Sequence, residues 1–207
     1  MYVPKHFHES DAGELARFMA ANSFALLLTT DERGMPFGTH LPLLYEPGTP
    51  ARILGHMAKA NPQWRQFRPE AEVLAVFAGP HAYVSPAWYD THPAVPTWNF
   101  AAVHVYGRPR LIDDEAEARA LLQRMVAVYE AGRPSPWSMT GLPNDYVGRM
   151  LNGIQAFAIE PTRLEGKFKL SQNRDARDRA NVAVALSGAA DTAAQATAAL
   201  MRKRAGR

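Results

Sequence analysis

The chain has 207 residues, 47% of them hydrophobic, and a formal net charge of +3 at pH 7. This is enough apolar material to bury a sizeable core, so long disordered stretches are not expected. Because the chain has no Cys, disulfides, thiolate metal sites and a Cys nucleophile are excluded. The mildly basic balance permits contact with phosphate ligands or nucleic acid without requiring it.

The first half of the chain predicts one helix followed by strands. Asp11 and Glu14 have capping-box spacing and begin a helix over residues 11–22. Asn61 as N-cap and Pro62 at the first helical position predict a short helix over 61–67. Strands are expected at 24–30 and 37–45, joined as a hairpin by the turn cluster 31–34, and at 52–57 and 73–78.

The second half continues the strands and adds helices. A long strand is expected at 98–107, and Asp113 or Asp114 caps a strongly amphipathic helix over 115–130. A short helix at 144–151 and two last strands at 154–160 and 164–170 follow. The strands form a near-continuous series without regular βαβ alternation. We therefore predict a mainly β fold, a closed or split antiparallel β-barrel with flanking helices.

We expect two parts: residues 1–174 as the barrel domain with inserted helices, and 175–207 as an Ala-rich, basic helical extension. The N-terminus is polar and lacks the apolar region of a secretory signal. Residues 181–201 carry one charge but are rich in Ala, Thr, Ser and Gln, which favours a small-residue helix over a membrane span. We expect a cytoplasmic protein that does not bind membranes.

Two segments place Trp, His, Asn and Lys at the ends of strands: 55–64, GHMAKANPQW, and 95–100, VPTWNF. In the first, Lys59 lies just before a helix N-terminus, where unpaired backbone N–H groups favour a phosphate. In the second, Trp98 can contact a ring and Asn99 can bond its edge. Capped turns, a packed Trp and a solvated Lys are the structural alternatives to this aromatic and cationic ligand site.

Two further segments each have a functional and a purely structural interpretation. Residues 79–89, GPHAYVSPAWY, can hold a rigid loop against a ligand or a second subunit, or form a surface loop packed by its own aromatics. On a strand at 166–170, Lys167 and Lys169 share one face, opposite Phe168 and Leu170. That lysine face suits an anion, or it guards a solvated edge strand.

The sequence lacks the motifs that would indicate other kinds of functional site. The seven His residues include no HExxH pattern or helical pair, so no metal site is predicted. A Walker A loop, a GxGxxG fingerprint and a GxSxG elbow are also missing, and no acid–base pair identifies catalytic residues. No helix-turn-helix is convincing, although the basic C-terminal end could contact DNA.

Together these motifs resemble the PaiB-type family of FMN-binding negative transcriptional regulators. The resemblance covers the chain to about residue 185 and is carried by MYVP at 1–4 with His6 and Phe7, HMAKANPQW at 56–64, GPHAYVSP at 79–86, VPTWNF at 95–100 and KFKLSQNR at 167–174. It implies an FMN-binding split barrel that forms a homodimer with flavin sites at the subunit interface.

The resemblance also implies a site. Related barrels hold the FMN phosphate at the strand-to-helix junction after the third strand, and the neighbouring hairpin strand lines the isoalloxazine. The candidate cofactor-binding residues here are Thr39, His40, Leu41, His56, Met57, Ala58, Lys59, Asn61, Trp98, Asn99, Lys169, Gln172 and Asn173. The last five form the remaining wall, which the partner subunit could supply.

Three functions follow for the same barrel. The first is a repressor that acts on DNA directly or through a regulatory protein partner. The second is an FMN-dependent oxidoreductase acting on a small molecule, which rests on analogy of fold. The third is a dimeric interaction module without flavin. The first is favoured, so an enzymatic activity is less expected than regulation.

Overall fold

The computed structural model describes residues 1–206. Residue 207, the last of the predicted extension, lies outside this range. The elements in chain order are η1 (Lys5–Phe7), β1 (His8–Glu9), α1 (Ala12–Ala21), β2 (Phe24–Thr30), β3 (Pro36–Glu46), β4 (Arg52–Ala58), η2 (Pro62–Gln66), β5 (Val73–Val84), η3 (Pro86–Trp88), β6 (Thr97–Ile112), α2 (Glu115–Glu130), α3 (Asn144–Asn152), β7 (Ile154–Lys169), α4 (Ala176–Ser187) and α5 (Thr192–Ala205).

The seven strands form one sheet in the order β1-β7-β4-β3-β2-β5-β6, and an additional pairing of β7 with β6 joins its two sides. Strands β7, β4, β3, β2 and β5 pair antiparallel along this order. A sheet whose two sides pair with each other is a barrel, which removes the exposed edges of an open sheet. The predicted antiparallel split barrel with flanking helices is confirmed.

Local sequence signals set the ends of several elements. The Asp11 carboxylate accepts from the backbone N–H of Glu14, and Asp114 does the same for Glu117. In the β2–β3 turn, Asp31 accepts from the N–H groups of Arg33 and Met35 at 2.8 Å each, and Gly34 has a φ of 80°. These are the caps and turn that the sequence predicted.

Two predicted boundaries are wrong. Strand β5 continues through residues 79 and 80 to Val84, where the sequence suggested a loop. A Cβ on Gly79 would lie 2.6 Å from the Phe18 ring, so this glycine permits close packing rather than a turn. The two predicted strands at 154–160 and 164–170 are the single strand β7, whose paired stretches with β4 and β1 lie on either side of Pro161.

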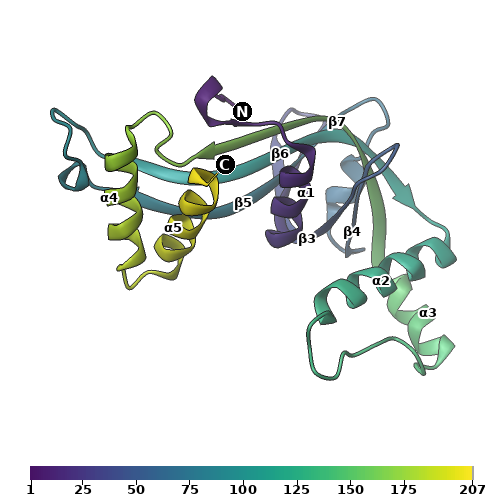
Figure 1. Cartoon of the computed structure of the whole chain (residues 1–207). Coiled ribbons are helices and arrows are strands. Elements are labelled where there is room, and N and C mark those ends of the chain that lie inside the picture. The colour runs from purple at the N-terminus through teal and green to yellow at the C-terminus, as the bar shows by residue number, and fades with distance from the viewer. Residues whose placement is uncertain (207) are drawn as a thin grey trace. The chain divides into compact units, whose positions relative to one another are not determined.

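The chain forms two compact units. Unit 1 contains Met1–Phe18, Phe77–His104 and the chain from Glu165 onward, and unit 2 contains Met19–Val76 and Val105–Leu164. Strands β5, β6 and β7 therefore contribute to both. In unit 2, α2 and α3 pack on β3, β4 and β7 (Figure 1); this core includes Leu44, Leu54, Leu121, Met125, Val147, Leu151 and Ala158.

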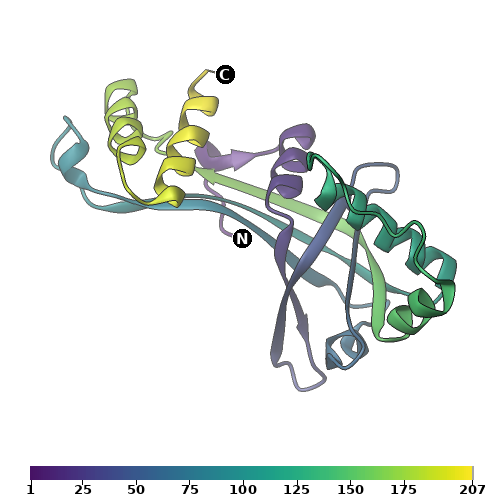
Figure 2. The same cartoon turned by 90° about the horizontal axis from the view of Figure 1, so that it is seen from below.

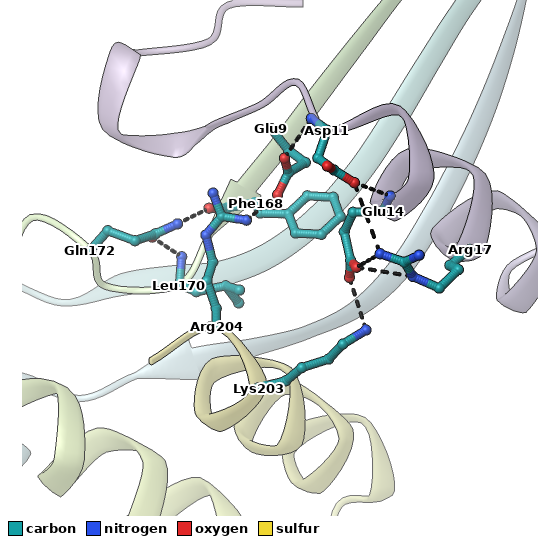
Figure 3. Close-up of polar contacts among 9 residues, drawn as sticks. All are labelled: Glu9, Asp11, Glu14, Arg17, Phe168, Leu170, Gln172, Lys203 and Arg204. Carbon is teal, nitrogen blue, oxygen red and sulfur yellow. Dashed lines mark hydrogen bonds and ion pairs between the residues drawn. The ribbon is translucent and has the colours of Figure 1, made fainter. Parts of the chain in front are cut away.

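In unit 1, α4 and α5 lie side by side (Figure 1). Ion pairs with two buried carboxylates join the end of α5 to the N-terminal segment: Lys203 bonds Glu14 at 3.0 Å, and Arg204 pairs with Glu9 (Figure 3). Glu9 and Glu14 are only 7% and 4% exposed, so their charges need these partners. The expected boundary at residue 175 coincides with the N-cap of α4, and a separate extension there stays a prediction.

The helices within residues 1–206 all lack the combination of length and apolar composition that crossing a membrane requires.

Candidate functional site

The candidate residues of unit 2 come together where β4 ends and η2 begins. Asn61 is the N-cap of η2: its side-chain oxygen accepts from the Gln63 backbone N–H at 3.0 Å. Its amide nitrogen donates to the Thr39 hydroxyl on β3, also at 3.0 Å. The predicted cap is confirmed, and the same side chain holds the start of η2 to the neighbouring strand.

Gln63 fixes this junction from inside, a role the sequence did not reveal. Its side chain is fully buried, and its amide nitrogen donates to the Leu27 and Phe37 carbonyls and the Thr29 hydroxyl. The β2–β3 turn and η2 accordingly lie at the same end of unit 2 (Figure 2). The only signal for Gln63 was its place in the segment at 55–64, because a Gln in a short helix is usually solvated.

The backbone around Lys59 is held while its side chain is left exposed. The Lys59 N–H donates to the Gly153 carbonyl at 2.8 Å, and the Lys59 carbonyl accepts from the Trp64 indole at 3.0 Å. Among residues 1–206, the Lys59 ammonium has no hydrogen-bond or ion-pair partner. A cation on a fixed backbone, without a carboxylate to neutralise it, is suited to bind an anion.

His56 adds a second polar group without a partner. Its Nδ1 is buried, and no group among residues 1–206 bonds it. Burial disfavours the imidazolium and lowers the pKa of His56 below its ordinary value. A neutral imidazole near pH 7 can donate or accept one hydrogen bond at this nitrogen, depending on its tautomer.

The other candidates of unit 2 differ in exposure. His40 is exposed, and its ring lies 6.2 Å from Phe24 at an interplanar angle of 24°. Leu41 and Met57 are each 4% exposed and belong to the core, whereas Ala58 is exposed. A ligand in this region would therefore meet Leu41 and Met57 chiefly through their backbone.

In unit 1, Trp98 and Asn99 point to opposite environments. Trp98 is 53% exposed and contacts the rings of Tyr83 and His81, with centroids 6.0 and 6.1 Å away. Asn99 is fully buried, and its amide nitrogen donates to the Ser171 hydroxyl at 2.9 Å and contacts the Met201 sulfur at 3.4 Å. In this chain, the Asn99 amide is engaged by internal partners.

The last candidates of unit 1 lie at the end of β7. Lys169 donates to the Thr97 hydroxyl, and its pKa is lowered by burial and then by the neighbouring Lys167. The Gln172 side chain accepts from the Leu170 N–H at 2.6 Å and donates to the Phe168 carbonyl (Figure 3). Asn173 is exposed. Phe168 and Leu170 are buried opposite the lysines, as the alternation predicted.

The residues of unit 2 fit a phosphorylated ligand by their chemistry. A hydroxyl on β3, a buried imidazole nitrogen without a partner on the neighbouring strand β4 and an exposed ammonium at the β4–η2 junction make up this donor set. Three or more metal-ligating side chains do not cluster anywhere in residues 1–206. A closed antiparallel barrel with such a donor set defines the class of flavin-binding split barrels.

The comparisons place the chain within this class. The model of the family described as "Putative FMN-binding domain" matches residues 1–163. Over 202 residues the chain is 39% identical to the "Protease synthase and sporulation protein PAI 2" of Bacillus subtilis (strain 168), covering 97% of this chain and 96% of that protein. The chain belongs to this FMN-binding family, and FMN is the flavin that the family implies.

Solved structures support the fold. The flavocytochrome Anf3 from Azotobacter vinelandii matches 86% of this chain and 78% of its own, with a TM-score of 0.62 and 18% identity. The FAD and heme binding protein from Mycobacterium smegmatis matches 88% and 80%, with a TM-score of 0.61 and 15% identity. At these identities the likeness concerns the arrangement of strands and helices.

Proposed function

We propose that this chain is a cytoplasmic, FMN-binding negative transcriptional regulator of the PaiB type that works as a homodimer. The observation that carries the proposal is the 39% identity, over 97% of the chain, to a protein named for protease synthesis and sporulation. Membership of the FMN-binding family supplies the ligand. Regulation and dimerisation are our inference from this relationship.

In this proposal, Lys59 binds the FMN phosphate together with the Thr39–Asn61 pair, and His56 bonds a polar atom of the flavin or of its ribityl chain. The fixed backbone of Lys59 supports this placement, because binding then has to order only the Lys59 side chain and not the turn that carries it. His40, Leu41, Met57 and Ala58 line the same region. When bound, the flavin itself supplies the redox and spectroscopic chemistry, while these residues bind and orient it.

The second wall of the site is proposed to come from unit 1 of the partner subunit: Trp98, Asn99, Lys169, Gln172 and Asn173. An exposed aromatic surface supports an interface in unit 1. Trp98 and Tyr83 are 53% and 47% exposed, and Val95 and Tyr2 are 69% and 83% exposed. The Trp98 and Tyr83 rings contact each other, and exposed aromatic surface of this kind is typical of subunit contacts. Asn99 would act by positioning Ser171 and the end of β7.

A gel-shift assay tests the regulatory role. FMN-loaded protein should bind the DNA upstream of its own gene more tightly than a random duplex of equal length, at a fixed salt concentration. Binding that does not distinguish the two duplexes would contradict a direct repressor, and a regulatory protein partner would then be required. Turnover of NAD(P)H above that of free FMN would instead support the oxidoreductase.

A further inference from the structure

Unit 1 contains a cavity between α4, α5 and the end of β7. The cavity has a volume of about 520 Å³, within the range of sites that bind small molecules. Its walls include Leu170, Ala183 and Met201, which are 3%, 8% and 5% exposed and belong to the core. The cavity thus has an apolar floor inside the C-terminal part of the chain.

Three arginines line this cavity, and no carboxylate of residues 1–206 does: Arg179 from α4, and Arg202 and Arg204 from α5. Arg204 is neutralised by Glu9 (Figure 3), while Arg202 bonds only the neutral Ser187 hydroxyl. The Arg179 guanidinium has no side-chain partner among residues 1–206. Arg179 is half-buried and Arg202 is exposed, so two guanidinium groups at this cavity have no carboxylate partner among residues 1–206 and can meet an anion.

We propose that this cavity binds a small amphipathic carboxylate, with Arg179 and Arg202 holding the carboxylate and the apolar floor holding its hydrocarbon part. Guanidinium groups match a carboxylate because their N–H donors are planar and forked. The floor of Leu170, Ala183 and Met201 excludes a purely polar anion as the best ligand, since inorganic phosphate would leave that surface uncovered. The ligand would be a regulatory one, separate from the flavin.

The lining of this cavity shares a single residue with the candidate flavin residues. It lies between residues 170 and 205 of unit 1, whereas the proposed phosphate-binding residues Thr39, Lys59 and Asn61 belong to unit 2. Gln172 is the one candidate flavin residue in the lining, and both ends of its amide already bond the backbone, at Phe168 and Leu170. Gln172 therefore contributes a fixed wall here rather than a free donor.

Calorimetric titration of the FMN-loaded protein tests the proposal. Decanoate below its micellar range is the probe, with decanol as the neutral analogue and inorganic phosphate as the anion without a hydrocarbon part. We expect one decanoate per chain, bound at least about tenfold tighter than decanol or phosphate. Equal binding of decanoate and decanol, or preference for phosphate, would overturn the proposal.

Variants locate the binding. Arg179→Gln should weaken decanoate about tenfold or more, whereas Arg177→Gln should not, because that arginine is on α4 but outside the lining and pairs with Asp90. Ala180→Leu narrows the cavity from an exposed position on α4 and should weaken decanoate without loss of helix. Unchanged affinity in both lining variants, or equimolar release of FMN by decanoate, would overturn a separate site.

Discussion

The candidate residues of unit 2 and those of unit 1 differ in how much hydrogen-bonding capacity the fold leaves free. Around the β4–η2 junction, Lys59 and His56 Nδ1 have no polar side-chain partner among residues 1–206. In unit 1, by contrast, the polar groups of Asn99, Lys169 and Gln172 bond within their own unit. The first group is therefore suited to bind a ligand directly, and the second to position the surface around it.

A polar residue in a motif can therefore have one of two roles: it binds the ligand, or it stabilises the fold. Removing a free donor on a fixed backbone should weaken ligand binding, whereas removing a buried and paired group should lower the stability of the protein. Each prediction below changes one residue of one group and measures both quantities, in order of decreasing effect.

Asn99→Ala should lower the free energy of unfolding by about 3 kcal/mol, since it opens a cavity and leaves the Ser171 hydroxyl buried without its partner. Urea denaturation of this variant measures the loss. The matched control is Asn173→Ala, whose side chain is exposed and whose removal should change stability by less than about 0.5 kcal/mol. Equal stability of Asn99→Ala and wild type would show that the buried amide is not structural.

Lys59→Ala should weaken FMN binding by about 1.5–3 kcal/mol, the usual range for a hydrogen bond to a charged group, with little change in stability. Quenching of flavin fluorescence gives the affinity, and urea denaturation gives the stability. Lys5→Ala, an equal change of charge at another exposed position, serves as control. If Lys59→Ala stays folded and binds FMN as wild type does, the phosphate placement is wrong.

Asn61→Ala should show both effects at a smaller scale. Loss of the cap on η2 and of the bond to Thr39 should cost about 1 kcal/mol of stability, and the loosened junction should weaken FMN. Asn61→Ser keeps a capping oxygen and should restore most of the stability but not the bond to Thr39. A full recovery of FMN affinity in Asn61→Ser would mean that the cap matters and the contact with Thr39 does not.

The pH dependence of stability should reflect the titration of two half-buried histidines. Burial lowers the pKa of His56, and it is also the main cause of the lowered pKa of His104. The unfolded chain therefore binds more protons, so stability should be complete above about pH 6.5 and fall as the pH drops below it. Denaturation between pH 7.5 and 5.5 should show a shallower slope in His56→Gln, and a slope equal to that of wild type would contradict the effect.

The sequence predicted the parts of the fold that depend on local signals. Turn chemistry at 31–34, the caps at Asp11, Asn61 and Asp114, and the alternation around Phe168 each have a local cause, and each was predicted correctly. The strand through Gly79 was missed, because the reason for that glycine is the Phe18 ring, about sixty residues earlier in the chain.

The candidate site shows the same limit. The sequence suggested that Lys59 and Asn61 lie at a strand-to-helix junction, which needs only neighbours in the chain. It did not reveal that Gln63 anchors this junction to β2 and β3, or that Ser171 and Met201 occupy the Asn99 amide. Those partners come from distant segments, so only the folded chain defines which polar groups are free.

The central claim is that the segment from His56 to Asn61 binds the phosphate of FMN, and the most direct measurement is the ratio of FMN to riboflavin affinity. Riboflavin has the same ring and ribityl chain but lacks the phosphate. Wild-type protein should bind FMN at least about tenfold tighter than riboflavin, and Lys59→Ala should remove most of that difference. Equal affinities of wild-type protein for the two flavins would contradict the account.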